Sequence, residues 1–219
     1  FQNEKYYLLK KNVQIESDNF SLFGDKIKIF FEKDLYDIKI IDALGNVKLI
    51  SPQYDINASG NSLIFKVTNE EINIIGKESK LITKDTKMFS DGEIKVNNIS
   101  GDFLIVGENS SLQSEGIFIR GKFIDGIFSS DQEKKEVIML DVKDEDIAYI
   151  NTDNTEMYAK IVKYNKDTSI IELENNVKII RDGETITGDY GTLDTKTNSY
   201  KVKSKESKKV KVIILDQDE

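Results

Sequence analysis

The chain has 219 residues, of which 38% are apolar, and its 31 Lys and Arg against 39 Asp and Glu give a net charge of -8. This length suits one large all-β domain or two modest units with a real core. The acidic excess argues against a nucleic-acid partner, and the absence of His and Cys excludes Ser-His-Asp triads, Cys-His pairs and the common zinc sites.

Short runs in which polar and apolar residues alternate recur along the whole chain. They fall at 26–31, 37–40, 47–49, 71–74, 93–96, 103–106, 117–119, 177–179, 200–202 and 210–212. Each has the length of a strand, and Ile and Val dominate its apolar positions. Asp-Gly pairs, as at Asp91-Gly92, separate several runs and are typical of hairpin turns. The charged segment 131–136 before Val137 is best interpreted as a polar loop followed by a strand. The pattern predicts an all-β meander of roughly a dozen or more short strands.

An internal repeat relates the two halves of the chain. The segment 26–78 can be laid over 160–207, so that Asn46-Val47 aligns with Asn176-Val177. Repeated hairpin units bury their apolar faces by stacking on neighbours. We therefore expect an N-terminal β unit over 1–132 and a C-terminal unit over 133–219, joined as one continuous stack.

Alternation also sorts side chains onto two faces. In the second copy, Ile171 and Val177 share one face, whereas Glu172 and Lys178 lie on the other. In the first copy, Ile38 and Ile40 are expected to pair with Val47 and Leu49 across a bulged or turned segment, Asp42–Asn46. If two apolar faces close on each other they form a simple core, and if they are held apart they form a slot for apolar chains. The alternation allows both.

The second copy also carries a recognisable series of residues. The series is Asn175, Asn176, Val177, Ile179, Ile186, Gly188, Asp189, Tyr190, Leu193, Thr197, Asn198, Tyr200 and Val202. In this order it resembles the OstA-like unit of periplasmic lipopolysaccharide-transport proteins, the LptA/OstA family. The first copy departs from the pattern where Ala58-Ser59-Gly60 replaces Thr187-Gly188-Asp189, and it keeps an opening like the family's at Ile15, Ser17 and Asp18. The resemblance covers about two-thirds of the chain.

This resemblance implies a β-jelly-roll, or folded sheet (β-taco), of stacked antiparallel strands around an apolar groove. It implies that lipid A acyl chains occupy the groove, that the protein lies in the periplasm, and that copies stack edge to edge into a bridge between membranes. The membrane-anchored bridge component LptC shares the fold, and the segment 107–123 is somewhat similar to that component. Because the chain begins at Phe1 and not Met, we expect a signal peptide or anchor to precede it, although an arbitrary boundary would look identical.

On this basis we expect two sets of site residues and no cofactor or metal. The lipid-groove candidates are Ile38, Ile40, Val47, Leu49, Ile56, Leu63, Phe65, Ile171, Leu173, Val177, Ile179, Ile186, Leu193 and Val202. The phosphate-rim candidates are Lys48, Arg120, Lys178 and Arg181. The alternative interpretation is an ordinary core with solvated surface cations. The net negative charge of the protein disfavours binding of an anionic lipid, so the positive charge at the rim must outweigh the field of the whole molecule.

Lysines near both ends of the chain suggest exposed edge strands. They are Lys10, Lys11, Lys208, Lys209 and Lys211. Such residues guard edges against uncontrolled pairing, and the same edges permit a partner to add a strand. Two functions therefore stay open. The first is a non-enzymatic lipopolysaccharide carrier that stacks with other bridge proteins or with itself, and the second is a secreted structural or adhesive β-solenoid without a lipid ligand.

Overall fold

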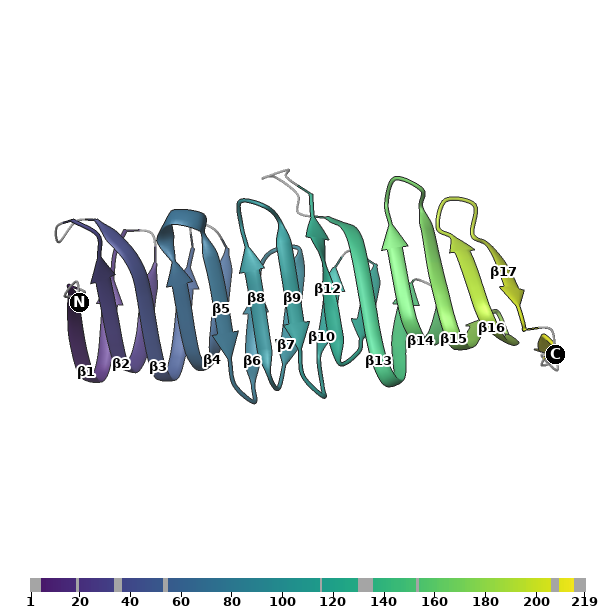
Figure 1. The fold of residues 1–219 in the computed structure, drawn as a ribbon, viewed down its shortest axis with the longest axis horizontal. Coiled ribbons are helices and arrows are strands. Elements are labelled where there is room, and N and C mark those ends of the chain that lie inside the picture. Colours follow the sequence, from purple (N-terminus) through teal and green to yellow (C-terminus); the bar gives the residue numbers. More distant parts are fainter. Residues whose placement is uncertain are drawn as a thin grey trace.

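The computed structural model describes residues 5–18, 20–33, 37–52, 55–114, 116–129, 136–152, 154–205 and 209–214. These residues form one elongated antiparallel β structure (Figure 1). The strands are β1 (Tyr6–Glu16), β2 (Ser21–Phe31), β3 (Ile38–Ser51), β4 (Ile56–Lys66), β5 (Glu71–Ile75), β6 (Ser79–Ile82), β7 (Thr86–Ser90), β8 (Glu93–Asn97), β9 (Asp102–Val106), β10 (Ser111–Ser114), β11 (Ile117–Arg120), β12 (Phe123–Phe128), β13 (Val137–Thr152), β14 (Thr155–Asn165), β15 (Ile170–Arg181), β16 (Glu184–Asp194), β17 (Ser199–Lys203) and β18 (Lys211–Ile214), with a 3₁₀ turn, η1 (Val67–Asn69), after β4. None of the described elements is a helix with the length and hydropathy needed to cross a bilayer.

The strands build two hydrogen-bonded layers, which we call wall A and wall B. The short strands β5, β8, β9, β12 and β17 belong to wall A, and β6, β7, β10, β11 and β18 belong to wall B. Each long strand, β1 to β4 and β13 to β16, contributes one half to each wall. The two walls therefore meet along one long side, the corner, and their turns face each other along the opposite side, the mouth.

The corner is encoded by residues in the left-handed region at the middle of the long strands. In β3, Gly45 and Asn46 have φ of 76° and 49°, and in β15, Asn175 and Asn176 have φ of 65° and 58°. The pairing register shifts at the same points, between Leu44 and Val47 and between Glu174 and Val177. Gly and Asn adopt this conformation at least cost, and such an interruption bends the strand. The bends lie along the lower side of Figure 1.

The inner faces of both walls carry unbroken apolar rows from one end of the stack to the other. In wall A the residues in cross-strand register are Leu9, Ile27, Ala43, Leu63, Ile74, Ile94, Ile105, Ile124, Val142, Val162, Leu173, Gly191 and Val202. In wall B they are Ile15, Leu22, Leu49, Ala58, Leu81, Met88, Leu112, Ile119, Ile150, Met157, Ile179, Ile186 and Val212. Most are buried in one continuous core. Full burial of each Leu or Ile contributes about 1.5–3 kcal/mol.

The expected stack of antiparallel strands is confirmed, and so is the strand that follows the charged segment, because β13 begins at Val137. Residues 131–135 of that segment lie outside the described residues, as does Lys208 near the C-terminus. The two aligned copies adopt the same local structure, since Asn46 and Asn176 both stand at the corner with positive φ. Pairing of β12 with β13 carries the sheet across the expected division between 132 and 133, and that division stays a prediction.

Candidate functional site

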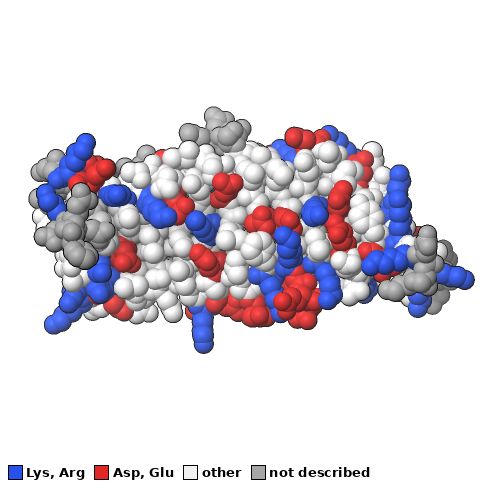
Figure 2. Space-filling view, in the orientation of Figure 1, with Lys and Arg blue, Asp and Glu red and all other residues white. Residues whose placement is uncertain are grey.

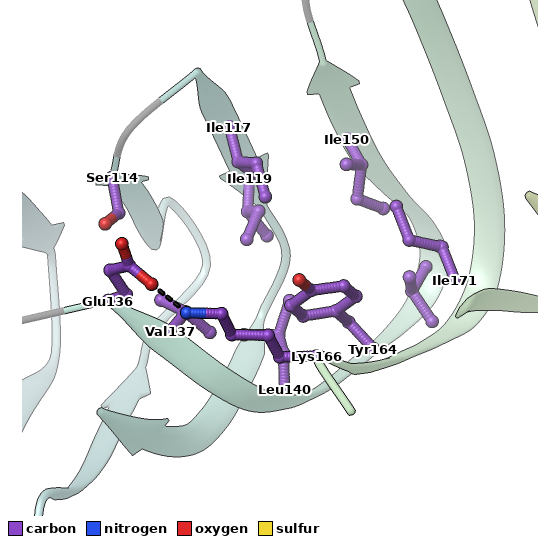
Figure 3. Close-up of a pocket in the computed structure, with 11 residues that line it drawn as sticks. Ser114, Ile117, Ile119, Glu136, Val137, Leu140, Ile150, Tyr164, Lys166 and Ile171 are labelled. Atoms are coloured by element: carbon purple, nitrogen blue, oxygen red, sulfur yellow. Dashed lines mark hydrogen bonds and ion pairs between the residues drawn. The ribbon is translucent and has the colours of Figure 1, made fainter. Parts of the chain in front are cut away.

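A cavity opens between the walls at the mouth, in the C-terminal half of the stack (Figure 3). Its volume is about 150 Å³. Its lining residues are Ser114, Ile117, Ile119 and Ile150 from wall B, and Glu136, Val137, Leu140, Val162, Tyr164, Lys166 and Ile171 from wall A and its turns. The lining is thus mainly aliphatic, and polar groups stand at its rim.

Strand alternation explains how these side chains converge. Ile119 lies opposite Ile150 in wall B, and Tyr164 lies between Leu140 and Ile171 in wall A. Neighbouring residues in each strand point outward, so each wall presents only alternate residues to the gap. Burial raises the pKa of Tyr164, which keeps its hydroxyl neutral. The inner part of the cavity is therefore uncharged.

Charge is confined to the rim. The Lys166 ammonium forms an ion pair with the Glu136 carboxylate across the end of the cavity, as Figure 3 shows. The Glu136 N–H donates to the Ser129 hydroxyl at 3.1 Å, which fixes the start of β13 at the mouth. An apolar interior with a charged rim is an arrangement that suits an amphiphile, with its apolar chain inside and its polar group at the mouth.

The cavity is small beside the rest of the interior. Ligand pockets for small molecules are typically about 300–1,000 Å³, so a volume of about 150 Å³ holds only a fragment of an acyl chain. Elsewhere the walls pack directly on each other, as the exposures of Ile74, Ile105 and Leu173 at 0% show. Accommodating a longer chain requires the walls to separate.

The expected groove residues mostly face the interior. Fully buried members of the set are Val47, Leu63, Ile171, Leu173, Val177, Ile179 and Leu193. Partly buried members that pack on the core are Ile38, Leu49, Ile56, Phe65 and Val202. Ile186 is half-buried between Ile179 and Val212 near the C-terminal end. The structure brings Ile171 to the cavity and leaves the others along the packed part of the interior, where contact with a ligand stays a prediction.

Ile40 differs from the expectation, because it does not join the core. A register irregularity places Phe30 opposite Ile40 but Phe31 opposite Ile38, so one extra residue of β3 is accommodated there. The alternation resumes out of phase, and Ile41, with 4% exposure, faces the interior instead. Simple alternation from Ile38 misses this change.

The expected phosphate-rim residues separate into two groups. Lys48, Arg120 and Lys178 alternate with buried residues of wall B and lie on its outer face. Arg181 lies at the mouth, where its Nη1 donates to the backbone carbonyl of Asn198 at 2.6 Å and its Nε donates to Asp182 at 3.2 Å. Contact of any of the four with a phosphate stays a prediction.

A second hydrogen bond crosses the mouth close to Arg181. The Tyr200 hydroxyl, from wall A, donates to the Glu184 carboxylate of wall B at 2.9 Å, and this bond raises the pKa of Tyr200. The C-terminal part of the mouth is thus tied across by polar contacts.

Several residues of the cavity were not among the sequence candidates. Leu140, Val162 and Tyr164 belong to β13 and β14, at the margin of the second copy, where the resemblance gave no motif. The alternation Val162-Lys163-Tyr164 could have indicated an inward face, but only the folded structure shows that this face borders a gap.

Comparison with known proteins finds similarity to solved structures but no match in sequence. No protein-family model matches the chain, and no curated protein sequence matches it significantly. Among solved structures, the chain is similar to LptH from Pseudomonas aeruginosa, described as the LptA homologous periplasmic component of the conserved lipopolysaccharide transport device. The two share 13% sequence identity with a TM-score of 0.49, and the match covers 60% of this chain and 95% of that one.

Proposed function

We propose that the protein is a non-enzymatic carrier that holds the acyl chains of a lipid between walls A and B. The observation that carries the proposal is the pair of facing apolar rows that run the length of the stack and open, at the mouth, into an aliphatic cavity with a charged rim. The lipid that the sequence resemblance names is lipopolysaccharide, and we propose it as the ligand, with the periplasm as the compartment.

The construction of the walls supports loading through the mouth. The strand ladders lie within each wall, so separating the walls at the mouth leaves these hydrogen bonds intact. Contacts between the inner rows are lost, and contacts with the incoming chain replace them. Each acyl methylene that is buried contributes about 0.8 kcal/mol, which offsets the separation of aliphatic side chains of similar size.

The ends of the stack support assembly with partners. The edge strand β1 exposes Tyr6 and Tyr7 at 49% and 48%, and β18 exposes Val212 and Ile214 at 53% and 66%. Unpaired strand edges accept further strands. Because the two ends present different strands, pairing of one end with the other is head to tail and continues the walls into the next molecule. We propose such stacking, with bridge proteins or with further copies of this chain.

A covalent crosslink across the mouth tests lipid carriage directly. The chain has no Cys, so Ser114→Cys with Glu136→Cys provides one thiol on each side of the cavity rim. A short bis-maleimide should join the two walls and block uptake. The measurement is binding of lipopolysaccharide by native mass spectrometry before and after crosslinking.

The matched control is Lys163→Cys with Glu174→Cys, a pair of adjacent positions on the outer face of wall A whose side chains lie 3.2 Å apart. Its crosslink leaves the mouth open, so this variant should keep full binding. Equal lipopolysaccharide binding by both crosslinked proteins would show that the lipid does not enter between the walls.

A second candidate function rests on the tight interior. Leu63, Ile94 and Ile124 are at most 1% exposed, as expected of a structural or adhesive β-solenoid that binds no lipid. In that case the uncrosslinked protein also fails to bind lipopolysaccharide in the same experiment.

A further inference from the structure

The outer face of wall B carries a continuous row of cationic, aromatic and small polar side chains, which we call the basic–aromatic row. In cross-strand register, its members are Phe23, Lys48, Ser59, Lys80, Phe89, Ser111, Arg120, Tyr149, Tyr158, Lys178, Thr187 and Lys211. The row itself contains no Asp or Glu, although the whole chain has a net charge of -8. One carboxylate, Glu156, lies beside it on the same face and accepts a hydrogen bond from the Tyr158 hydroxyl at 2.8 Å.

Direct contacts fix the centre of this row. The Arg120 guanidinium lies over the Tyr149 ring at 5.7 Å, and the Lys178 ammonium lies over the Tyr158 ring at 5.3 Å. The two tyrosine rings are 5.1 Å apart, and Phe118 lies beside Tyr149 at 6.1 Å. Burial raises the pKa of Tyr158 to about 12, so no anionic phenolate forms here near neutral pH. The result is a preordered surface of rings flanked by cations.

The outer face of wall A is built differently. Several of its lysines pair with carboxylates, as in Lys66 with Glu71 at 2.6 Å and Lys163 with Glu174 at 3.2 Å, whereas Lys28 lies over the Tyr6 ring. Figure 2 shows acidic and basic groups interspersed on the face formed by β5, β8, β9 and β12. Within the described part of the chain, by contrast, no ion pair involves a cation of the basic–aromatic row. The cations of the row are therefore available to an external anion.

We propose that the basic–aromatic row binds a linear acidic polysaccharide along the outside of wall B. Its cations, on β3, β6, β11, β15 and β18, are separated by two or three strands, which is about 10–14 Å at about 4.8 Å per strand. A linear polyanion matches a linear series of charges. The outward edges of the aromatic rings between the cations offer apolar surface to sugar rings, while the cations pair with carboxylate or sulfate groups.

This site does not depend on lipid carriage, because its side chains point away from the interior. The cations of the row must attract the polysaccharide although the protein as a whole is acidic. Binding should therefore weaken steeply as the salt concentration rises. Ring contacts add a part that salt does not remove. A saccharide site should therefore show binding that weakens with salt but does not vanish, whereas a surface that binds through charge alone should lose all binding at high salt.

The test measures binding of the full chain to carboxymethyl dextran by calorimetry at low salt. The variant Arg120→Gln with Lys178→Gln should bind about tenfold more weakly, since it removes two cations at the centre of the row. The control Lys143→Gln with Lys163→Gln removes the same charge from wall A, where Lys143 pairs with Asp141 at 3.3 Å, and should bind as the parent does. The Tyr149→Leu variant, checked for folding by circular dichroism, should also bind more weakly.

Four outcomes overturn the proposal. Equal weakening by the wall A control shows that binding follows net charge alone. Binding of polyphosphate as tight as that of carboxymethyl dextran, or tighter binding of anionic phospholipid vesicles, shows that sugar rings are not recognised. Binding of uncharged dextran with the parent affinity shows that the cations play no part.

Discussion

Filling the cavity at the mouth should stabilise the empty protein while hindering lipid uptake. Val162 is 1% exposed and lines the cavity of about 150 Å³. The change Val162→Phe adds about four carbons, worth at most about 3 kcal/mol at about 0.8 kcal/mol each. Cavity filling usually yields about 0.5–2 kcal/mol, so we expect a gain of about 1–2 kcal/mol in the free energy of unfolding.

The matched control is the cross-strand neighbour Val142, which is 0% exposed and does not border the cavity. Val142→Phe overpacks a filled region and should cost about 1–3 kcal/mol. Urea unfolding followed by circular dichroism measures both values, and lipopolysaccharide binding by native mass spectrometry should fall in Val162→Phe. If Val162→Phe destabilises the protein as much as Val142→Phe, the cavity beside Val162 cannot accommodate a larger side chain, which contradicts the prediction.

Other changes test the corner, the interior and an ion pair. At the corner, where Asn176 has φ of 58°, Asn176→Val should cost about 1–2 kcal/mol whereas Asn176→Gly should be nearly neutral in urea unfolding. A Cβ at Gly126 would lie 2.6 Å from Phe103 Cζ, so Gly126→Ala should lower stability by about 1–3 kcal/mol in the same assay. The hydrogen bond from Lys66 lowers the pKa of Glu71 below its ordinary value near 4.5, so its stabilisation is present above that value and is lost as the pH falls through the lowered pKa. The Glu71→Gln variant should therefore lose less stability than the parent between pH 5 and about pH 3, and an equal loss would contradict the assignment.

The sequence predicts much of this architecture because strand alternation is a local signal. Runs such as 93–96 and 117–119 became β8 and β11, and the repeat placed Asn46 and Asn176 at equivalent positions. It did not predict that one long strand serves both walls, since the bend depends on two residues in the left-handed region within an otherwise continuous run. It also misplaced Ile40, because one extra residue in β3 reverses the side-chain phase.

The site was less accessible to sequence reasoning for a physical reason. Whether two apolar faces touch or leave a gap depends on the volumes of residues far apart in the chain, such as Ile117 and Tyr164. The basic–aromatic row likewise exists only through the register of many strands, and Arg120 and Lys178 show no special spacing in the sequence. Local patterns fix the face on which a residue lies, but they do not fix its neighbours across strands.

The bent long strands also determine how such a molecule can grow. Each hairpin, such as β14 with β15, adds two rungs to both layers at once and carries its own bend at Asn175 and Asn176. Duplicating one hairpin therefore lengthens the particle by about 10 Å without altering its cross-section. Evolution or protein engineering can thus change the length of this scaffold in fixed steps of one hairpin.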